Sequence, residues 1–584
     1  MAALMLLSLF TVSFSAYAAS TYVSYKKIDD YAVVSGCSSA AKGVIEIDST
    51  YEGVPVKEIN ASAFENIPGI TGIVVPSSVT KVGNLAFANC PSLQNVEFEG
   101  GECTFGNSVF RSGGKLSSVT LPSELTSIPK QTFFDCSALI QITIPASVTT
   151  IGSEAFATCS KLTKVTIPAS VTSIGSNAFI RCQAVESYNV ASGNTTYKSV
   201  NGALYDITGR TLIQYPGGSN ETSVTVDSDT KIIGNGAFAG NRKIESVVFP
   251  ENLETIEDYA FQYCENLGAV TLPPYIKTLG KEAFGHCTAV KSIELPSTLT
   301  TYEYSFYMAG LESVTIKKGA AAISRNAFEK CDKLTSVSIP DTVKTIGVAA
   351  FIDCKALESI SVPASVTSIG NKTFSGCNLL IMTVVKDSAA HTYAKNNSIR
   401  YTFENASQTT PSAVVVRTQP AKTVYEAGES VSIDGLTLFA EYADGTSKKI
   451  TEGIKLDSVT RAENGKSTVT VSYGGKTVSF EVTVNGSSDE IAVTGIEITK
   501  LPTKLDYNYK DKFSRSGMIV IAKYSDGSQA EISGYTVTPD TFTKTGSHTV
   551  TVEYEGFKDT VNVSVSYSFV QIIILIFLLG FLWY

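Results

Sequence analysis

The stretch LIQITIPASVTTIGSEAFATCSKLTKVTIPASVTSIGSNAFIRC, from Leu139 to Cys182, contains nearly the same phrase twice. Its two phenylalanines, Phe156 and Phe179, are 23 positions apart. The shared template is A-F-x-x-C-x-x-L-x-x-V-x-I-P-x-x-V-x-x-I-G. A fixed period of about 20 to 30 residues is typical of a solenoid, in which each unit buries its apolar side against its neighbours.

The phenylalanine of the template counts the copies along the chain. The series is Phe64, Phe87, Phe110, Phe133, Phe156, Phe179, Phe238, Phe261, Phe284, Phe306, Phe328, Phe351 and Phe374. Most steps equal that from Phe156 to Phe179, and the two steps on either side of Phe306 are shorter by one position. The step from Phe179 to Phe238 is more than twice as long as the others. The sequence therefore predicts thirteen repeats with one insertion.

Each copy contains a predicted short strand. Ile142 and Ile144 alternate with Gln141 and Thr143, which is the period-2 pattern of a half-buried strand. Pro145 lacks an amide hydrogen, so it is expected to end the pairing of that strand. One strand per copy predicts a ladder of strands along the solenoid.

The second half of the copy is predicted to turn the chain. Gly152 suits a turn with positive φ. Ala155 and Phe156 are then expected to pack inward on a short turn or helix. A stack of buried phenylalanine rings would supply a large apolar core.

The cysteines follow the same repeat. Nine of the eleven fall three residues after a repeat phenylalanine, and Cys37 and Cys103 fall outside the series. An odd number of cysteines at one repeat position fits disulfides poorly, so we expect a column of small buried thiols. The pairing of Cys37 and Cys103 stays open. No C-x-x-C motif occurs and the three histidines are scattered, so no metal site is expected.

The phrase IPASVTSIGSNAFIRC, from Ile167 to Cys182, resembles the signature of the BspA-like (Treponema pallidum type) leucine-rich repeat family. The run Leu139-x-x-Ile142-x-Ile144 is the corresponding L-x-x-L-x-L core. The likeness extends over roughly Tyr51 to Cys377. It implies a bacterial or, less often, protist cell-surface protein of a family often discussed as adhesins.

The N-terminus is interpreted as a secretory signal peptide, residues 1–18. An apolar segment ends in Ala16-Tyr17-Ala18, an A-x-A cleavage site. No basic residue precedes the apolar segment, so the true start is expected upstream. Residues 19–60 are predicted to cap the solenoid with a polar outer face.

The solenoid is predicted over 61–403, with a hairpin insert at 187–230 and a C-terminal cap at 387–403. Asn201-Gly202 and Thr208-Gly209 are turn signals within the insert. Two interpretations of the insert stay open, a binding protrusion and a variant repeat.

The predicted C-terminal cap contains a short helix. Asp387-Ser388 would cap a helix over Ala389 to Lys395. His391 is expected to pack in the cap or to be exposed, and not to be a ligand.

After a linker at 404–412, two related modules follow at 413–485 and 492–566. GLTLFAEYADGTSKKI, from Gly435 to Ile450, matches GMIVIAKYSDGSQAEI, from Gly517 to Ile532. Alternating strands around an Asp-Gly turn predict a small β-sandwich in each module. The modules resemble the bacterial immunoglobulin-like group 3 domain, which implies a spacer of surface proteins. The predicted fold class is therefore mainly β with short helical turns, a leucine-rich-repeat solenoid followed by two immunoglobulin-like β-sandwiches.

The chain ends in a hydrophobic tail at 569–584 that carries no charge. As a helix the tail would cover roughly 24 Å, which is short of the roughly 30 Å hydrocarbon core. Two interpretations stay open: a marginal anchor with membrane contact, or the product of a truncated or frameshifted reading frame.

Composition and motifs exclude several classes of function. The formal charge of −9 disfavours nucleic-acid binding. No G-x-S-x-G, H-E-x-x-H or P-loop motif occurs, so neither an enzyme nor a cofactor is predicted. An enzyme acting on wall polymer lacks a recognisable site.

A binding function remains, and the exposed side of the repeat strands is the candidate surface. Its residues are Gln141, Thr143, Lys164, Thr166, Ser292, Glu294, Ser336, Ser338, Ser359 and Ser361. This surface is rich in hydroxyls and lacks Tyr, Trp and Arg anchors, which favours weak contacts multiplied along an array. The alternative is that these are solvated strand positions without a ligand.

The sequence predicts an exported, extracellular or cell-surface adhesin whose partner is a host extracellular protein, a glycan or another cell surface. The rival hypothesis is a structural component of the envelope, or a truncated part of a larger surface protein without its own ligand.

Overall fold

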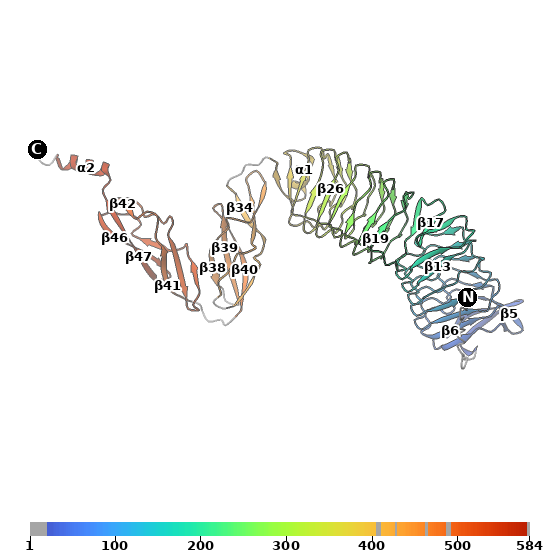
Figure 1. Cartoon of the computed structure of the whole chain (residues 1–584). Coiled ribbons are helices and arrows are strands. Elements are labelled where there is room, and N and C mark those ends of the chain that lie inside the picture. Colours follow the sequence, from blue (N-terminus) through green and yellow to red (C-terminus); the bar gives the residue numbers. More distant parts are fainter. Residues whose placement is uncertain (1–19, 405–409, 427–428, 462–464, 486–491, 581–584) are drawn as a thin grey trace, which may run out of the picture. The chain divides into compact units, whose positions relative to one another are not determined.

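The computed structural model describes residues 20–404, 410–426, 429–461, 465–485 and 492–580 (Figure 1). The chain divides into two compact units, Met1–Asn397 and Ser398–Tyr584. The predicted signal peptide and part of the predicted linker lie outside the described residues.

In the first unit the chain winds as a solenoid, and its coils supply two series of parallel strands. In the first series, Lys164 pairs with Ser187 of the next coil. In the second series, Thr150 pairs with Ser173 of the next coil. Both registers join residues 23 positions apart, which is the sequence period. The first series consists of β3 (Lys42–Glu46), β6 (Gly69–Val75), β8 (Asn95–Phe98), β10 (Ser118–Thr120), β13 (Lys164–Ile167), β15 (Ser187–Val190), β19 (Ser223–Thr225), β21 (Ser246–Val248), β23 (Ala269–Val270), β25 (Ser292–Leu295), β26 (Ser313–Ile316), β28 (Ser336–Ser338), β30 (Ser359–Val362) and β32 (Ile381–Val384).

The second series is made of shorter strands. Like the first series, it is divided among several sheets. It consists of β5 (Val54–Ile59), β7 (Lys81–Val82), β9 (Thr104–Phe105), β11 (Ser127–Ile128), β12 (Thr150–Ile151), β14 (Ser173–Ile174), β18 (Thr211–Gln214), β20 (Ile232–Ile233), β22 (Thr255–Ile256), β24 (Thr278–Leu279), β27 (Ala322–Ile323), β29 (Thr345–Ile346) and β31 (Ser368–Ile369).

The predicted strand around Ile142 is not formed, and this prediction was wrong. Gln141 makes a single parallel bridge to Lys164, and the residues up to Ile144 belong to no strand. The alternation of side chains is nevertheless present, because Gln141 and Thr143 are exposed and Ile144 is buried. Burial of every second side chain does not require the backbone to pair on both sides, so the pattern alone overestimated the strand.

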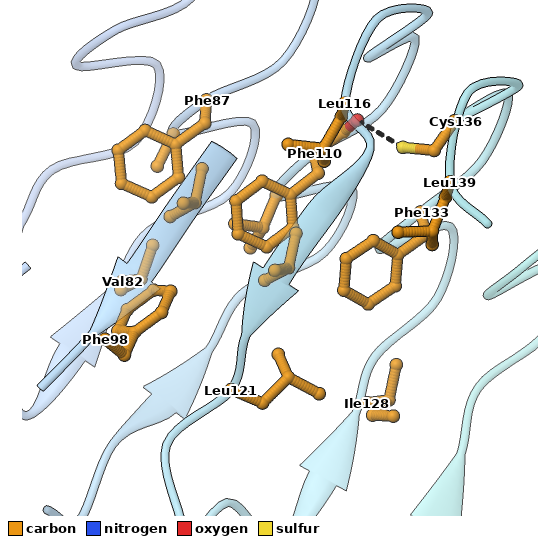
Figure 2. Close-up of a cluster of buried hydrophobic side chains, with 14 of the residues drawn as sticks. Val82, Phe87, Phe98, Phe110, Leu116, Leu121, Ile128, Phe133, Cys136 and Leu139 are labelled. Atoms are coloured by element: carbon orange, nitrogen blue, oxygen red, sulfur yellow. Dashed lines mark hydrogen bonds between the residues drawn. The ribbon is translucent and has the colours of Figure 1, made fainter. Parts of the chain in front are cut away.

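The repeat phenylalanines form the core of the solenoid. All thirteen are at most 3% exposed. Within each run of coils, the centroids of successive rings lie 4.6 to 5.6 Å apart. Figure 2 shows three of these rings, Phe87, Phe110 and Phe133, side by side in successive coils. The prediction of an inward-facing phenylalanine stack is confirmed.

The turn that carries Phe156 is not helical. Its amides bond to the following coil: Phe156 N–H donates to the carbonyl of Ala178 at 2.8 Å, and Thr158 N–H to that of Ile180 at 2.9 Å. Positive φ occurs at Glu154 (57°) and Thr158 (61°). A helix would use these amides within its own turn, so bonding between coils excludes it.

Gly152 does not have the positive φ that we predicted. Glycine is needed here because the backbone of the preceding coil lies very close. A Cβ atom at this position would lie 2.5 Å from the backbone nitrogen of Lys130 in the preceding coil. Gly175 stands in the same relation to Ser153, at 2.4 Å. Glycine at this position therefore permits close approach of two backbones.

The insert is larger than the single hairpin that we predicted. β16 (Tyr197–Val200), β17 (Ala203–Asp206) and β18 form an antiparallel meander, and β18 then pairs in parallel with β20. Asn201 and Gly202 have φ of 50° and 78° at the β16–β17 turn. Tyrosines of this region continue the ring stack, since Tyr188 contacts Phe179 and Tyr215 contacts Phe238.

Additional elements lie at both ends of the solenoid. η1 (Ser20–Tyr22) precedes an antiparallel pair of β1 (Val23–Ile28) and β2 (Tyr31–Cys37), and β4 (Thr50–Tyr51) pairs with β5. At the other end, α1 (Ala389–Asn396) begins after Ser388, whose hydroxyl accepts a hydrogen bond from the amide of His391. The helix ends one residue after the predicted Lys395, and His391 is buried in it.

The second unit contains two β-sandwiches, as predicted, each with its own core. The first core includes Leu438 and Val469, and the second includes Val520 and Phe542. The unit starts with β33 (Arg400–Phe403). The first sandwich has sheets β34-β36-β37 and β35-β40-β39-β38, and the second has sheets β41-β43-β44 and β42-β47-β46-β45. The strands are β34 (Ala413–Thr418), β35 (Val424–Glu426), β36 (Thr437–Glu441), β37 (Ser447–Ile450), β38 (Lys455–Arg461), β39 (Lys466–Tyr473), β40 (Lys476–Asn485), β41 (Val493–Lys500), β42 (Asp506–Asn508), β43 (Ile519–Tyr524), β44 (Gln529–Glu531), β45 (Thr536–Thr538), β46 (Gly546–Tyr554) and β47 (Phe557–Ser566).

The tail forms α2 (Phe569–Gly580). Within the described residues, no helix has both the length and the apolar character needed to cross a membrane.

Candidate functional site

The candidate surface is the outward side of the first series of strands. All ten residues predicted for it are exposed. In β13, Lys164 and Thr166 point outward while Val165 and Ile167 are buried. The same alternation places Ser292 and Glu294 outward in β25. Burial of the apolar half of each strand therefore orients the polar half toward solvent.

The larger group of predicted residues, all of them C-terminal to the insert, lies on two sheets. β25, β26 and β28 form one sheet, in which Ser292 pairs with Ser313, which pairs with Ser336. A second row runs from Glu294 through Thr315 to Ser338. On the other sheet, Ser361 pairs with Thr383 of β32 and Ser359 with Ile381.

A smaller group lies nearer the N-terminus. Gln141 bridges to Lys164, and Lys164 and Thr166 pair with Ser187 and Asn189 of β15. Thr143 is exposed beside this group and belongs to no strand. The sheet of β19, β21 and β23 intervenes along the chain, so the structure does not join the two groups in one sheet.

The sequence interpretation missed the middle coil of the larger group. Ser313 and Thr315 stand between the predicted residues of β25 and β28. The run LESVTI, from Leu311 to Ile316, has the same L-x-x-V-x-I core and is the signal that finds them. Sheet pairing makes them part of the same two rows.

The charges at the edge of the larger group are paired. The Lys317 ammonium lies 2.7 Å from the Glu294 carboxylate, and that of Lys291 lies 2.9 Å from Glu312. Exposed pairs of this kind contribute about 0–1 kcal/mol each. Because the carboxylate of Glu294 already has a cationic partner, the remaining polar groups of the two rows are mainly hydroxyls.

The surface is suited to repeated shallow contact. Neighbouring coils place equivalent side chains about 4.8 Å apart, the spacing of strands in a sheet. None of the ten predicted residues is aromatic. In the part of the chain that the structure describes, no group of His, Cys, Asp and Glu side chains is placed to hold a metal ion.

Comparison with known families agrees with the two-unit architecture. The model of the BspA type leucine rich repeat region matches residues 57–186, 217–333 and 300–415, which together are more than half of the chain. The model of the bacterial Ig-like domain (group 3) matches residues 418–484 and 501–565.

The chain is also similar in part to solved structures of bacterial proteins. A leucine-rich repeat protein from Eubacterium ventriosum is 23% identical, with a TM-score of 0.46, covering 64% of this chain and 96% of that one. A leucine rich cell surface protein from Faecalibacterium prausnitzii is 23% identical, with a TM-score of 0.43, covering 65% and 97%. The pneumococcal vaccine antigen PcpA is 20% identical, with a TM-score of 0.45, covering 66% and 98%.

One curated relative is similar over a shorter length. Pectate lyase L of Thermoclostridium stercorarium is 29% identical over 167 residues, which are 28% of this chain. The chain spans 13% of the length of that relative. The family assignment therefore rests on the repeat, and the chain belongs to the BspA type leucine rich repeat family, here joined to two bacterial Ig-like domains of group 3.

Proposed function

We propose that this protein is an exported, cell-surface adhesin that binds without catalysis. The outward rows of the first series contact a host extracellular protein, a glycan or another cell, and the Ig-like modules act as spacers. The observation that carries the proposal is the pair of rows Ser292–Ser313–Ser336 and Glu294–Thr315–Ser338 on one continuous parallel sheet.

The chemistry of these rows supports binding through many weak contacts. Hydroxyl groups both donate and accept hydrogen bonds, so one type of polar ligand group can be bound in every coil. Each contact alone is weak, but contacts on one rigid array add, and many copies on a cell surface add avidity. A ligand with a repeating polar structure fits such an array best.

The test compares two double variants of the full chain. Thr315→Trp with Ser338→Trp fills the second row, and Ser173→Trp with Ser368→Trp places the same side chains on exposed positions of the second series. Binding is measured to matrix proteins, mucin, cell-wall glycans and whole cells. We expect saturable binding by the wild type and the control, and at least tenfold weaker binding by the row variant.

Two results would contradict the proposal in different ways. Equal binding by both double variants would place the site elsewhere on the chain. Absence of saturable binding by the wild type to every ligand class would favour the rival function, a structural component of the envelope.

A further inference from the structure

The first series of strands is interrupted at the insert. β15 pairs with β13, and β19 pairs with β21. β15 and β19 belong to different sheets and do not pair with each other. Both strands therefore have one edge at the interruption, next to β17 in the solenoid (Figure 1). An unpaired edge exposes backbone donors and acceptors.

The insert covers one of these edges. The amide of Tyr188, in β15, donates to the carbonyl of Gly202 at 2.8 Å. The hydroxyl of Ser199 donates to the carbonyl of Tyr188 at 2.7 Å. The β16–β17 hairpin thus supplies the hydrogen bonds that a neighbouring strand would otherwise make to β15.

The edge of β19 is left open. The carbonyl of Thr222 accepts from the amide of Ser246 at 3.2 Å, and the amide of Val226 donates to the carbonyl of Val248 at 3.0 Å. Backbone groups of successive strand residues point to opposite edges, so those of Ser223 and Thr225 point away from β21. Within residues 20–404, the amides of Ser223 and Thr225 have no hydrogen-bond partner.

This open edge lines a pocket of about 420 Å³. Apolar groups of the pocket come from Tyr205 of β17, Leu212 of β18 and Val224 of β19. The charged residues that line it are Glu221 and Asp227, both acidic, and neither belongs to an ion pair within the described residues. The pocket thus combines a strand edge, an apolar wall and negative charge.

We propose that this pocket binds an extended polypeptide segment carrying a basic side chain, which adds to the edge of β19 as a further strand. The segment's backbone pairs with Ser223 and Thr225. Its alternate side chains enter the apolar part of the pocket or lie beside Glu221 and Asp227.

The hydrogen-bonding pattern selects a polypeptide as the occupant. Donor and acceptor groups on the β19 edge recur at every second residue, about 6.6 Å apart. An extended peptide presents complementary groups at the same interval, and strand addition at exposed edges is a recurring mode of peptide recognition. The acidic side chains favour a lysine or arginine in the segment by charge complementarity.

This pocket is separate from the rows that contain Thr315 and Ser338, so this proposal and the proposed adhesin function can fail independently. The two also differ in chemistry, because here the backbone of β19 provides the recognition and not exposed hydroxyl side chains.

The test starts with a selection of random heptapeptides on the full chain. We expect enriched peptides in which apolar residues alternate with lysine or arginine. A synthetic copy methylated on alternate backbone nitrogens should bind at least tenfold more weakly in one methylation register, because that register removes the donors that pair with β19. Equal binding in both registers would overturn strand addition.

Protein variants locate the binding. Thr225→Pro removes the outward amide and places a ring on the edge, which an edge strand tolerates. Thr225→Ala is the matched control, because it keeps the amide. We expect enriched peptides to bind Thr225→Ala like the wild type and to bind Thr225→Pro at least tenfold more weakly, with unchanged thermal unfolding for both variants.

A charge variant keeps the proposal testable if Thr225→Pro does not fold. Glu221→Lys should weaken the binding of basic peptides at least fivefold. Glu303→Lys, at an exposed position on another coil, should leave that binding unchanged. Failure to enrich any peptide would overturn the proposal, as would equal binding to all variants. Binding of a cell-wall oligosaccharide that Thr225→Pro abolishes would assign the pocket to a glycan instead.

Discussion

The thiol of Cys159 donates a hydrogen bond to the carbonyl oxygen of Phe133, which lies 3.2 Å away and one coil earlier. The other eight cysteines of the repeat series make the same contact to the phenylalanine of the preceding coil, as Figure 2 shows for Cys136 and Phe110. The Sγ–O distances of those eight contacts are 2.9 to 3.2 Å. All eleven cysteines are free, and Cys37 is half-buried while the other ten are buried.

The buried thiols should resist alkylation in the folded protein. Burial raises the pKa of Cys136 and Cys182 to about 12 and that of Cys37 to about 11. Because the thiolate is the reactive form, we expect iodoacetamide at pH 8 to leave the nine buried thiols of the repeat series unmodified. Mass spectrometry should find all eleven modified after unfolding in urea. Rapid modification of Cys159 in the native protein would contradict its buried position.

Removing one ring from the phenylalanine stack should destabilise the solenoid. Phe156 is fully buried between Phe133 and Phe179, with ring centroids 5.2 and 5.4 Å away. We expect Phe156→Ala to cost about 3–5 kcal/mol, because the substitution leaves a cavity and each neighbouring ring loses the packing contact with Phe156. Denaturant unfolding measures the effect. Thr166→Ala, at an exposed position, is the control and should change stability by less than about 0.5 kcal/mol.

The glycine of the repeat offers a test of close backbone approach. A Cβ atom at Gly152 would lie 2.5 Å from the nitrogen of Lys130, whereas at Gly268 the nearest atom would be 3.9 Å away. We expect Gly152→Ala to destabilise by about 1–3 kcal/mol through overpacking. Gly268→Ala should be neutral within about 0.5 kcal/mol. Equal midpoints of urea unfolding for the two variants would contradict this prediction. They would show that neighbouring coils can move apart to accommodate the Cβ atom without loss of stability.

Stability should depend on pH through Glu254. Hydrogen bonds from the Lys231 and Lys277 ammonium groups, each at 2.8 Å, lower the pKa of Glu254 to about 2. The unfolded carboxyl has a pKa of about 4.3, so the contribution is present above that pH and is lost as the pH falls toward 2. We expect Glu254→Gln to be less stable than the wild type at pH 7 and equally stable near pH 2.

The matched control for this titration is Glu251→Gln. Glu251 is exposed and makes no ion pair within the described residues. Its substitution should leave the pH profile of the thermal unfolding temperature unchanged. A profile of Glu254→Gln that parallels the wild type between pH 2 and pH 7 would contradict the role of the two lysines.

Periodicity made the core of this fold predictable. The interval between repeat phenylalanines identifies the coil, and the buried stack from Phe64 to Phe374 follows directly from it. The Asp-Gly turns of the two sandwiches were equally visible, and Gly445 and Gly527 both have φ of 82°. These features depend on residues that are close in the sequence or strictly repeated.

Features that depend on contacts between coils were harder to predict. Glycine serves both positive φ and close backbone approach, and the sequence does not distinguish them at Gly152. The residues that do have positive φ, such as Glu154 and Thr158, are not of types that indicate it. Likewise, the length of the insert showed an interruption, but only the meander determines that the β19 edge stays open.

The ring stack also bears on how the gene can change in length. The step from Phe306 to Phe328 is one position shorter than the step from Phe328 to Phe351, yet the ring centroids are 5.5 and 5.3 Å apart. The shortening falls between the repeat phenylalanine and the leucine that follows it, since Leu311 follows Phe306 by five residues whereas Leu334 follows Phe328 by six. The two nearly identical phrases within Leu139–Cys182 are one whole repeat apart. Because each coil stacks only on its neighbours, gain or loss of one such unit in frame would lengthen or shorten the solenoid by one coil while keeping the same surface chemistry.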